Sequence, residues 1–438
     1  MFDIVYVGGG LNYAGAVVAA KNGKRVALIE KEMGQLGGIC LHKGCIPSKM
    51  FLHYSRLLYE SKNEILEGDL TLSMKTLQEK KEVLLQSVTK VVLKQCADIE
   101  LIEGEGVITA PHKVEVNGET IEAEHIVIGT GSHPFMPEGI AYNAKDIITS
   151  DEVLMMRELP EKIAIYGDGA IGLEMAGFFA TSGTEVTLIY RHDAIQKNAH
   201  PYIRRALARE LEKLGIALLP NHSIKEAVST KKGVHISFEE GDDMDVPMLL
   251  VASGRVPNSS VIGCSDINVG RGIQTNEWFE TNLPGHYAIG DCNGKIQLAH
   301  AARAQVLNVT GQILGSHPRA LNLEHVVKFI HTLPMSYAQV GESRSSLEKS
   351  KQEYRESVVT LNQFTYSTYN HASGGVMVTY ADRDEFILGA EIFAPNAEEL
   401  IAAVAMALAG EMDVSQAKQT ILAHPTFSEA LERTFYKL

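Results

Sequence analysis

Cysteine is scarce in this sequence, and long apolar runs are absent. Five cysteines in 438 residues are too few for the disulfide framework of a secreted domain. The longest apolar run, residues 400–410, is shorter than the about 20 residues that a transmembrane helix needs. The N-terminus (MFDIVYVGGG) starts with a strand-like segment and shows none of the parts of a signal peptide. We therefore expect a cytoplasmic protein with no membrane partner.

Positive charge is also in short supply. The chain has 40 basic and 54 acidic residues, which gives a formal net charge of −14. Proteins that bind nucleic acids non-specifically need a basic surface, so no nucleic-acid partner is expected. The content of hydrophobic (45%) and charged (21%) residues is ordinary for a globular protein. At about 150 residues per domain, the length predicts about three domains.

Two segments show the strand–turn–helix–strand order of a nucleotide-binding unit. In the first, apolar residues 2–7 lead to three glycines, a helical stretch at 14–21 and a strand at 25–29. The second, residues 162–190, repeats the pattern about 160 positions later. Two such units predict two dinucleotide sites, one in each of two domains.

The remaining segments complete the predicted architecture. A charged helical stretch (75–95) and a β-rich piece (99–127) separate the two units, and an α+β domain without a nucleotide motif follows Pro318. We predict an α/β fold with two Rossmann-like dinucleotide-binding domains and a C-terminal α+β domain. The expected boundaries are 1–148 and 266–317 for the first domain, 149–265 for the second and 318–438 for the third.

The second glycine motif has the full G-x-G-x-x-G spacing. Gly167 permits a tight turn, Gly169 lets the backbone approach a pyrophosphate, and Gly172 lets the helix pack on the strand. The helix N-terminus would then face the phosphates. The alternative is a glycine-rich packing turn.

The end of the next strand indicates which coenzyme binds. An acidic residue there would bond to the 2′-hydroxyl of NAD, but this sequence has Tyr190, Arg191 and His192, with Lys197 nearby. A cationic cluster suits the 2′-phosphate of NADP. The alternative is a solvated basic loop, and we expect a preference for NADP.

The first glycine motif is incomplete. Gly8 and Gly10 are in place, but Tyr13 occupies the position of the third glycine. Glu30 ends the next strand and suits a ribose hydroxyl. A nucleotide site is still expected, with Tyr13 disturbing the packing of helix on strand and Gly15 as a compensating position.

Cys40 and Cys45 lie five residues apart in the segment CLHKGCIPSK. On a regular helix they would be about 7.5 Å apart along the axis, beyond the about 6.8 Å limit between the Cα atoms of a disulfide. The turn between them must therefore be distorted, which Gly44 permits. Pro47 suits the start of a helix, and a helix N-terminus would lower the thiol pKa of Cys45. No second cysteine pair with zinc spacing exists, so no metal is expected.

The segment HPTFSE near the C-terminus places His424 five residues before Glu429. Such a pair can form an oriented base, in which the carboxylate holds the imidazole. The alternative is structural, because Thr426 and Glu429 have the spacing of a helix capping box. The segment alone favours the cap.

Together these motifs resemble the class I pyridine nucleotide–disulfide oxidoreductases, a family that includes dihydrolipoyl dehydrogenase, glutathione reductase and mercuric reductase. The resemblance covers essentially the whole chain in the family's order. It rests on GGICLHKGCIPSK (37–49), IVIGTGSHP (126–134), GDGAIGLEMA (167–176), GRVPN (254–258), YAIGDCNGKIQLAHAA (287–302), ILGAEIFAPNAEELI (387–401) and HPTFSEALE (424–432).

The resemblance implies FAD and a pyridine nucleotide as cofactors and assigns catalytic roles. Cys40 corresponds to the thiol that exchanges with the substrate, and Cys45 to the thiol beside the flavin. Lys49 corresponds to a lysine near the flavin that pairs with Glu174 beside the nicotinamide.

The last domain corresponds to the family's dimerisation domain. The resemblance implies that His424 and Glu429 form an acid–base dyad that serves the other subunit of a homodimer, so that active sites are shared. Glu429 would then both cap the helix and orient His424.

The cofactor residues implied by motifs and resemblance form two sets. The FAD set is Gly8, Gly10, Glu30, Lys49, Gly106, Thr130, Gly131, Ser132, Asp291, Gln297, Leu298, Ala299 and His300. The NAD(P) set is Gly167, Gly169, Gly172, Glu174, Tyr190, Arg191, His192 and Gly254.

The substrate is less clearly indicated. CIPSK and QLAH are most similar to dihydrolipoyl dehydrogenase, whereas Arg191 and His192 resemble glutathione reductase. Val18 stands where glutathione reductase has an arginine, which argues against glutathione. We expect an FAD-dependent NAD(P)H:disulfide oxidoreductase most like dihydrolipoyl dehydrogenase, with membership of a multienzyme complex left open. The alternatives are an NADPH-dependent reductase of glutathione-like or other small disulfides or of reactive oxidants, and a flavin-binding thiol sensor or scaffold.

Overall fold

The computed structural model describes residues 1–62 and 65–438, which form two compact units. Unit 1 consists of Met1–Met50, Lys75–Phe135 and Gly254–Leu323. Unit 2 consists of Phe51–Met74, Met136–Ser253 and Glu324–Leu438. No helix among the described residues is long and apolar enough to cross a membrane.

Unit 1 is built on a seven-stranded sheet with the order β3-β2-β1-β6-β5-β4, in which β17 also pairs with β6. The strands are β1 (Phe2–Val7), β2 (Val26–Glu30), β3 (Glu100–Glu103), β4 (Val107–Ala110), β5 (Lys113–Val116), β6 (Glu119–Ile128) and β17 (His286–Ala288). A short antiparallel pair, β7 (Ser132–Pro134) and β16 (Arg255–Pro257), follows β6. The central strands β1 and β2 are buried along nearly their whole length, as expected for parallel strands covered on both faces.

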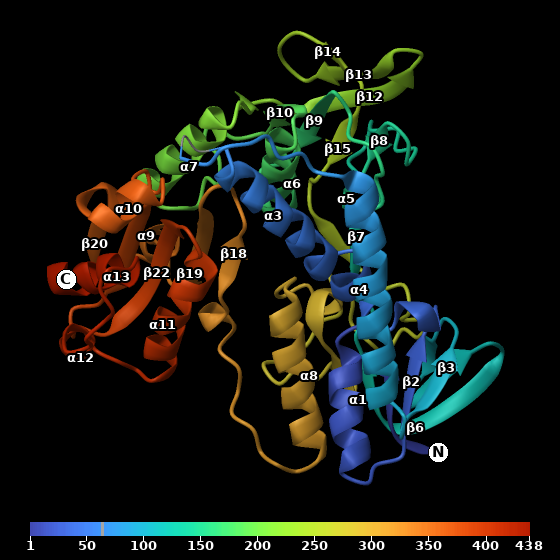
Figure 1. The fold of residues 1–438 in the computed structure, drawn as a ribbon. Helices are drawn as coiled ribbons and strands as arrows, with labels where there is room; N and C mark the ends of the chain where they lie inside the picture. The colour runs from blue at the N-terminus through green and yellow to red at the C-terminus, as the bar shows by residue number, and fades with distance from the viewer. Residues whose placement is uncertain (63–64) are drawn as a thin grey trace. The chain divides into compact units, whose positions relative to one another are not determined.

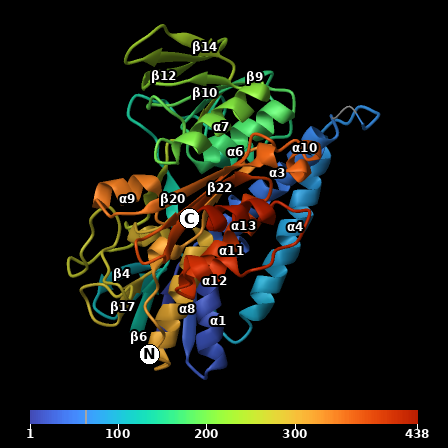
Figure 2. The same ribbon diagram turned by 90° about the vertical axis from the view of Figure 1, so that its left-hand side faces the viewer.

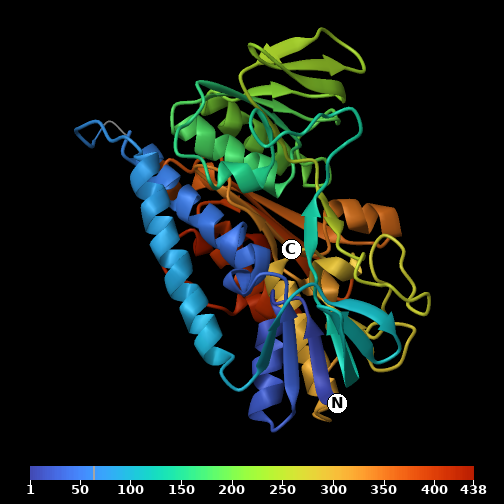
Figure 3. The same ribbon diagram turned by 90° about the vertical axis from the view of Figure 1, so that its right-hand side faces the viewer.

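Helices cover one face of this sheet, and irregular segments cover much of the other. The helices of this unit are α1 (Asn12–Lys21), α2 (Gly38–His42), α4 (Met74–Gln95) and α8 (Ala299–Ile313). Apolar side chains of α1, α4 and α8 share one core cluster with the sheet, and Figure 1 shows α1 and α8 side by side. A second cluster on the opposite face includes Val114, Ile267 and Ile273. Figure 3, in which the right-hand side of Figure 1 faces the viewer, shows the dark-blue strands β1 and β2 next to α1.

Gly15 explains how α1 packs although Tyr13 replaces the third motif glycine. A Cβ atom on Gly15 would lie 2.6 Å from side-chain atoms of both Val306 and Thr310 on α8. The close approach of the two helices therefore requires a glycine at position 15. Tyr13 lies half-buried against the same core cluster, so the expected disturbance does not prevent α1 from forming.

Unit 2 contains the second nucleotide-binding pattern. Its parallel sheet has the order β11-β10-β9-β15-β8, and a three-stranded antiparallel sheet, β12-β13-β14, adjoins it in the chain. The strands are β8 (Ile147–Ile148), β9 (Lys162–Tyr166), β10 (Glu185–Ile189), β11 (Ala217–Leu219), β12 (Ile224–Thr230), β13 (Gly233–Phe238), β14 (Met244–Val246) and β15 (Leu249–Val251). The helices are α5 (Ser150–Val153), α6 (Ala170–Thr181) and α7 (Pro201–Lys213), and Figure 2 shows α6 and α7 beside this sheet. α3 (Cys45–Glu60) begins in unit 1 and ends in unit 2.

The C-terminal part of unit 2 is an antiparallel sheet with the order β18-β19-β22-β21-β20. The elements are β18 (Lys328–Ile330), β19 (Ser336–Gly341), α9 (Arg344–Ser350), β20 (Arg355–Thr360), α10 (Thr365–Tyr369), β21 (Val376–Ala381), β22 (Ile387–Ala394), α11 (Ala397–Ala409), α12 (Val414–Lys418) and α13 (Ser428–Lys437). The side chains of β21 and β22 are buried along almost their entire length, so both faces of the sheet are covered. α11, α13 and α7 pack against it. The predicted α/β class with a C-terminal α+β domain is confirmed. The residue ranges predicted for the three domains remain a prediction.

Candidate active site

The two cysteines flank a break between helices. α2 ends at His42 and α3 begins at Cys45, so the distorted turn that their spacing required is present. A Cβ atom on Gly44 would lie 2.9 Å from the carbonyl oxygen of Ile39, so only glycine fits this turn without a shift of the backbone. Pro47 occupies the first turn of α3, where its missing N–H leaves no hydrogen bond unmade.

The thiols of Cys40 and Cys45 contact each other. The hydrogen bond to Cys45 is the main cause that raises the pKa of the Cys40 thiol, and burial raises it further. The ammonium group of Lys49 acts in the opposite direction but more weakly. Cys45 is exposed at the start of α3, and Cys40 is half-buried. A thiol whose pKa is raised needs a base before it can attack a disulfide, because the thiolate is the nucleophile.

The first glycine loop approaches the turn before the cysteines. Gly38 has φ +67°, and a Cβ atom on it would lie 2.7 Å from the Cα atom of Gly10. Gly10 itself has no other atom closer than 3.9 Å to its Cβ position. Such an open backbone position beside a helix N-terminus is compatible with the pyrophosphate of FAD. Gly8 has φ +95°, which favours glycine over other residues.

Glu30 ends β2 and faces this loop. The backbone N–H of Gly9 donates a hydrogen bond of 2.6 Å to its Oε2 atom. Burial raises the pKa of the Glu30 carboxyl group, and the bond from Gly9 partly opposes that effect. A carboxylate fixed at the end of the second strand is compatible with a ribose hydroxyl.

A hydrogen-bonded chain joins three distant segments of unit 1. The Oγ atom of Ser132 donates to Oδ2 of Asp291 at 2.6 Å and accepts from Nε of Arg255 at 2.7 Å. Arg255 also donates to the carbonyl oxygen of Ser132 at 2.7 Å. Burial raises the pKa of Asp291, and the Ser132 bond and the Arg255 charge counteract it. The charge of Arg255 thus favours the ionised form of Asp291, which is one of the residues predicted to contact FAD.

Arg255 and Asn258 were not among the predicted site residues. Asn258 accepts a hydrogen bond of 2.6 Å from Oγ1 of Thr130 through its carbonyl oxygen, and its amide donates to the carbonyl oxygen of Thr130 at 2.9 Å. Both residues belong to the GRVPN segment, which was identified as a family signature without a role for its side chains. The presence of two polar side chains in that signature was the available signal.

The remaining FAD candidates also lie in unit 1. Gly131 has φ +71° and no atom within 4 Å of its Cβ position, so it leaves open space. Gly106 lies against Ile29 on β2. The amide of Gln297 donates to the carbonyl oxygen of Arg255 at 3.4 Å. The other candidates form the start of α8, namely Leu298 as the N-cap residue followed by Ala299 and His300.

The second glycine motif has the geometry of a dinucleotide turn. A Cβ atom on Gly172 would lie 1.9 Å from the carbonyl oxygen of Gly167, so glycine is required there. Gly169 is the N-cap residue of α6 and has no atom within 4 Å of its Cβ position. The N-terminus of this 12-residue helix therefore lies behind an open backbone position. This arrangement fits the pyrophosphate of a pyridine nucleotide.

The segment after β10 presents basic side chains. Tyr190 is buried, His192 is half-buried, and Arg191 and Lys197 are exposed. The backbone N–H of Gln196 donates to Oδ2 of Asp168 at 2.9 Å, which ties this segment to the glycine turn. No acidic residue takes the position at the end of β10 that would suit NAD.

Glu174 and Gly254 complete the coenzyme set. Glu174 is buried on α6, and its Oε1 atom accepts the backbone N–H of His331 at 3.1 Å. Lys49 belongs to unit 1, and its pairing with Glu174 stays a prediction. Gly254 has φ +122° and, unlike the other coenzyme candidates, belongs to unit 1.

His424 and Glu429 are brought together as a dyad. Nδ1 of His424 lies 2.7 Å from Oε1 of Glu429, and the His424 side chain is 79% exposed. The other carboxylate oxygen accepts the backbone N–H of Thr426 at 3.1 Å. The hydrogen bond to His424 lowers the pKa of Glu429. With Nδ1 facing the carboxylate, Nε2 is the nitrogen available for proton transfer.

The predicted capping box forms only in part. Glu429 does accept the N–H of Thr426, but the Thr426 hydroxyl donates to the carbonyl oxygen of Ala423 at 2.7 Å instead of capping α13. The N-cap residue of α13 is Phe427, and no side chain caps it. The carboxylate of Glu429 therefore orients His424 and supports the preceding turn at the same time.

Known proteins similar in sequence cover nearly the whole chain. Dihydrolipoyl dehydrogenase 1 of Arabidopsis thaliana mitochondria is 31% identical, over 98% of this chain and 89% of its own. The dihydrolipoyl dehydrogenase of Bacillus subtilis is also 31% identical, over 98% of this chain and 96% of its own. The solved structure of the HOCl-induced flavoprotein disulfide reductase RclA from Escherichia coli shares the fold with a TM-score of 0.89, at 24% identity over 99% of both chains.

Two family patterns account for both parts of the chain. The pyridine nucleotide-disulphide oxidoreductase pattern matches residues 2–305, and the dimerisation domain of the same family matches residues 326–435. Both matches confirm the family that the sequence motifs indicated. The chain therefore belongs to the pyridine nucleotide-disulphide oxidoreductases, as a flavoprotein enzyme that uses FAD and a pyridine nucleotide for disulfide chemistry and forms a homodimer.

Proposed function

We propose that this enzyme exchanges electrons between NADP(H) and a small disulfide or dithiol, with dihydrolipoamide as the first substrate to test. The observation that carries the proposal is the contact between the Cys40 and Cys45 thiols across the α2–α3 break. The dihydrolipoyl dehydrogenases among its relatives favour a lipoyl dithiol. A role in a multienzyme complex is compatible with these relatives. We propose the cytoplasm as the location.

The proposed chemistry requires only adjacent groups. FAD, when bound, carries the electron pair between the pyridine nucleotide and the cysteine pair. In the direction of disulfide reduction, the Cys40 thiolate attacks one substrate sulfur, and the other sulfur leaves as a thiolate. Cys45 then attacks the Cys40 sulfur, which releases the second substrate thiolate and forms the Cys40–Cys45 disulfide.

His424 is the proposed acid and base for these steps. The raised pKa of Cys40 means that its proton must be removed before attack, and the imidazole can take it through Nε2. Glu429 holds the ring and stabilises the imidazolium that forms. The leaving thiolate then receives the proton. We propose that each dyad serves the cysteine pair of the partner subunit.

The basic segment after β10 supports NADP over NAD. Arg191 and Lys197 are exposed where the 2′-phosphate of the coenzyme would lie. This feature also supports the second candidate, an NADPH-dependent reductase of another small disulfide or of a reactive oxidant. A thiol sensor with incidental turnover is the third, and a low turnover with every disulfide would favour it.

The test compares NAD⁺ and NADP⁺ as acceptors of electrons from dihydrolipoamide. We expect turnover with both and a higher kcat/KM with NADP⁺. Arg191→Ala is expected to remove that preference, whereas Arg209→Ala, an exposed arginine on α7, serves as the matched control. Absence of turnover with either acceptor, from a preparation that holds FAD, would refute the lipoyl substrate and direct attention to NADPH-driven reduction of other disulfides.

A further inference from the structure

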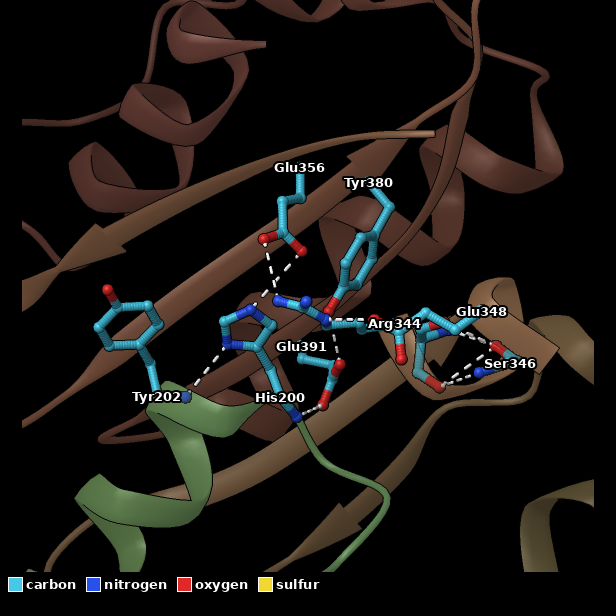
Figure 4. Close-up of polar contacts among 9 residues, drawn as sticks. His200, Tyr202, Arg344, Ser346, Glu348, Glu356, Tyr380 and Glu391 are labelled. Carbon is cyan, nitrogen blue, oxygen red and sulfur yellow. Dashed lines mark hydrogen bonds and ion pairs between the residues drawn. The ribbon is translucent and has the colours of Figure 1, made fainter. Parts of the chain in front are cut away.

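A buried carboxylate lies where the coenzyme-binding part of unit 2 packs on the C-terminal sheet. Glu391 on β22 has no exposed surface. It accepts hydrogen bonds from the hydroxyl groups of Tyr337 at 2.8 Å and Tyr380 at 2.7 Å, and from the backbone N–H of His200 at 2.9 Å. The backbone N–H of Arg344 is a fourth donor. Figure 4 shows Glu391 between His200 and Tyr380.

Both oxygens of the Glu391 carboxylate accept hydrogen bonds, and the donors come from separate elements. Its donors lie on β19, on β21, at the start of α9 and just before α7. Burying a carboxylate is costly, and an apolar side chain of similar size would often be the more stable choice. Four donors aimed at one carboxylate instead fix the positions of the groups that carry them.

His200 is the member that connects this cluster to the coenzyme. It is 1% exposed and directly precedes α7, and its Nδ1 atom accepts the backbone N–H of Tyr202 at 3.3 Å. Its Nε2 atom lies 3.6 Å from Glu356, which is longer than a hydrogen bond. The bond from the His200 backbone to Glu391 therefore fixes where α7 begins and where the preceding segment ends.

That segment, residues 190–199, carries the basic side chains proposed to bind the coenzyme. It is held at one end by the N–H of Asn221, which donates to the carbonyl oxygen of His192 at 3.1 Å, and in the middle by Asp168 and Gln196. Glu391 holds the other end. The segment is thus fixed on one side by the glycine turn and on the other by the C-terminal sheet.

We propose that Glu391 is a positioning residue for the pyridine nucleotide. It acts through the backbone of His200 and keeps the basic segment in the conformation that receives the adenosine end of the coenzyme. This inference rests on the proposed role of Arg191 and Lys197. Because the apparent dissociation constant rises as the binding-competent fraction falls, loss of this support weakens coenzyme binding without altering the cysteine chemistry.

The test is Glu391→Gln in the full-length FAD-loaded enzyme. The amide keeps the shape but turns one acceptor into a donor that faces the donors around it. We expect KM for the coenzyme to rise about tenfold, since a hydrogen bond to a charged group is lost. kcat at saturating coenzyme and KM for the disulfide are expected to change less than about twofold. Calorimetric binding of adenosine 2′,5′-bisphosphate, which cannot reduce the flavin, is expected to weaken by the same factor.

Two further variants keep the inference falsifiable. Glu348→Gln removes a charge that contacts Arg344 but not His200, and it is expected to leave coenzyme binding unchanged. Tyr337→Phe removes one donor and is expected to raise KM for the coenzyme in the same direction but less; it replaces Glu391→Gln if that variant does not fold. Equal losses of flavin content and kcat, with no selective change in coenzyme binding, would show a purely structural role.

Arg191→Ala separates this inference from the proposed coenzyme site. If Arg191→Ala weakens binding of the bisphosphate and neither Glu391→Gln nor Tyr337→Phe does, the coenzyme site stands and the positioning role of Glu391 is refuted. If Arg191→Ala has no effect, the proposed coenzyme segment itself is wrong.

Discussion

Replacing Gly169 by alanine is the sharpest test of where the pyridine nucleotide binds. The backbone of Gly169 has φ −73° and ψ −177°, which alanine adopts without strain, and no atom lies within 4 Å of the added Cβ. The change should therefore alter the free energy of unfolding by less than about 1 kcal/mol. Any large effect must come from a ligand that occupies the open space.

The size of that effect follows from contact distances. A phosphate oxygen bonded to the N-terminus of α6 lies about 2.8 Å from a backbone nitrogen, whereas a methyl carbon needs about 3.5 Å from its neighbours. The phosphate must retreat, and loss of one hydrogen bond to a charged group costs about 1.5–3 kcal/mol. This corresponds to a rise in KM for the coenzyme of about tenfold to a hundredfold.

Gly172→Ala is the matched comparison. Its Cβ would lie 1.9 Å from the carbonyl oxygen of Gly167, so the turn must move, and we expect destabilisation by about 1–3 kcal/mol or more. Stopped-flow reduction of the flavin by the coenzyme measures binding, and thermal release of FAD measures stability. If Gly169→Ala leaves coenzyme binding as well as stability unchanged, the pyrophosphate does not bind at the start of α6 and the reasoning fails.

Four further outcomes are expected. Cys45→Ser should abolish disulfide turnover while flavin binding persists, and full activity in a steady-state assay would contradict the mechanism. Mixed dimers of Cys40→Ser and His424→Ala subunits should regain activity that neither homodimer has; no recovery would exclude active sites shared between subunits. Gly15→Ala should destabilise unit 1 by about 1–3 kcal/mol through overpacking against α8, as measured by chemical denaturation. Burial lowers the pKa of His286 in the folded protein. Below about pH 6.5, the pKa of an unfolded histidine, the unfolded chain therefore binds protons more readily than the folded one, and the free energy of unfolding falls by up to about 1.4 kcal/mol per pH unit. An unfolding free energy that does not change with pH below about 6.5 would refute this reasoning.

Local features of the site could be predicted from the sequence because their causes are local. The spacing of Cys40 and Cys45 excluded a continuous helix, and Gly44 showed where the break would fall. The strand–turn–helix order located Gly167 and Gly172 for the same reason. Each of these inferences depends on residues fewer than about ten positions apart.

Other features depend on contacts between distant segments, which the sequence alone does not reveal. Ser132 meets Arg255 and Asp291 across separations of 123 and 159 residues. Glu391 reaches His200 across 191 residues. The prediction of a capping box at Thr426 was also wrong in part, because the Thr426 hydroxyl donates to the carbonyl oxygen of Ala423 and does not cap α13. The first two arrangements depend on how distant segments meet in the fold, whereas at Thr426 the carbonyl oxygen of Ala423 competes locally for the hydroxyl.

The close contact of α1 with α8 has a consequence for synthesis of the chain. Helix α8 ends at Ile313, so the N-terminal core around Gly15 lacks one side until almost three-quarters of the protein has left the ribosome. Strand β17, which completes pairing with β6, emerges only slightly earlier. By contrast, the core cluster of residues 140–251 is contiguous in the chain. The segment inserted into unit 1 therefore completes this core cluster before the sheet of unit 1 has all of its strands. The growing polypeptide must keep its first strands from aggregating during that interval.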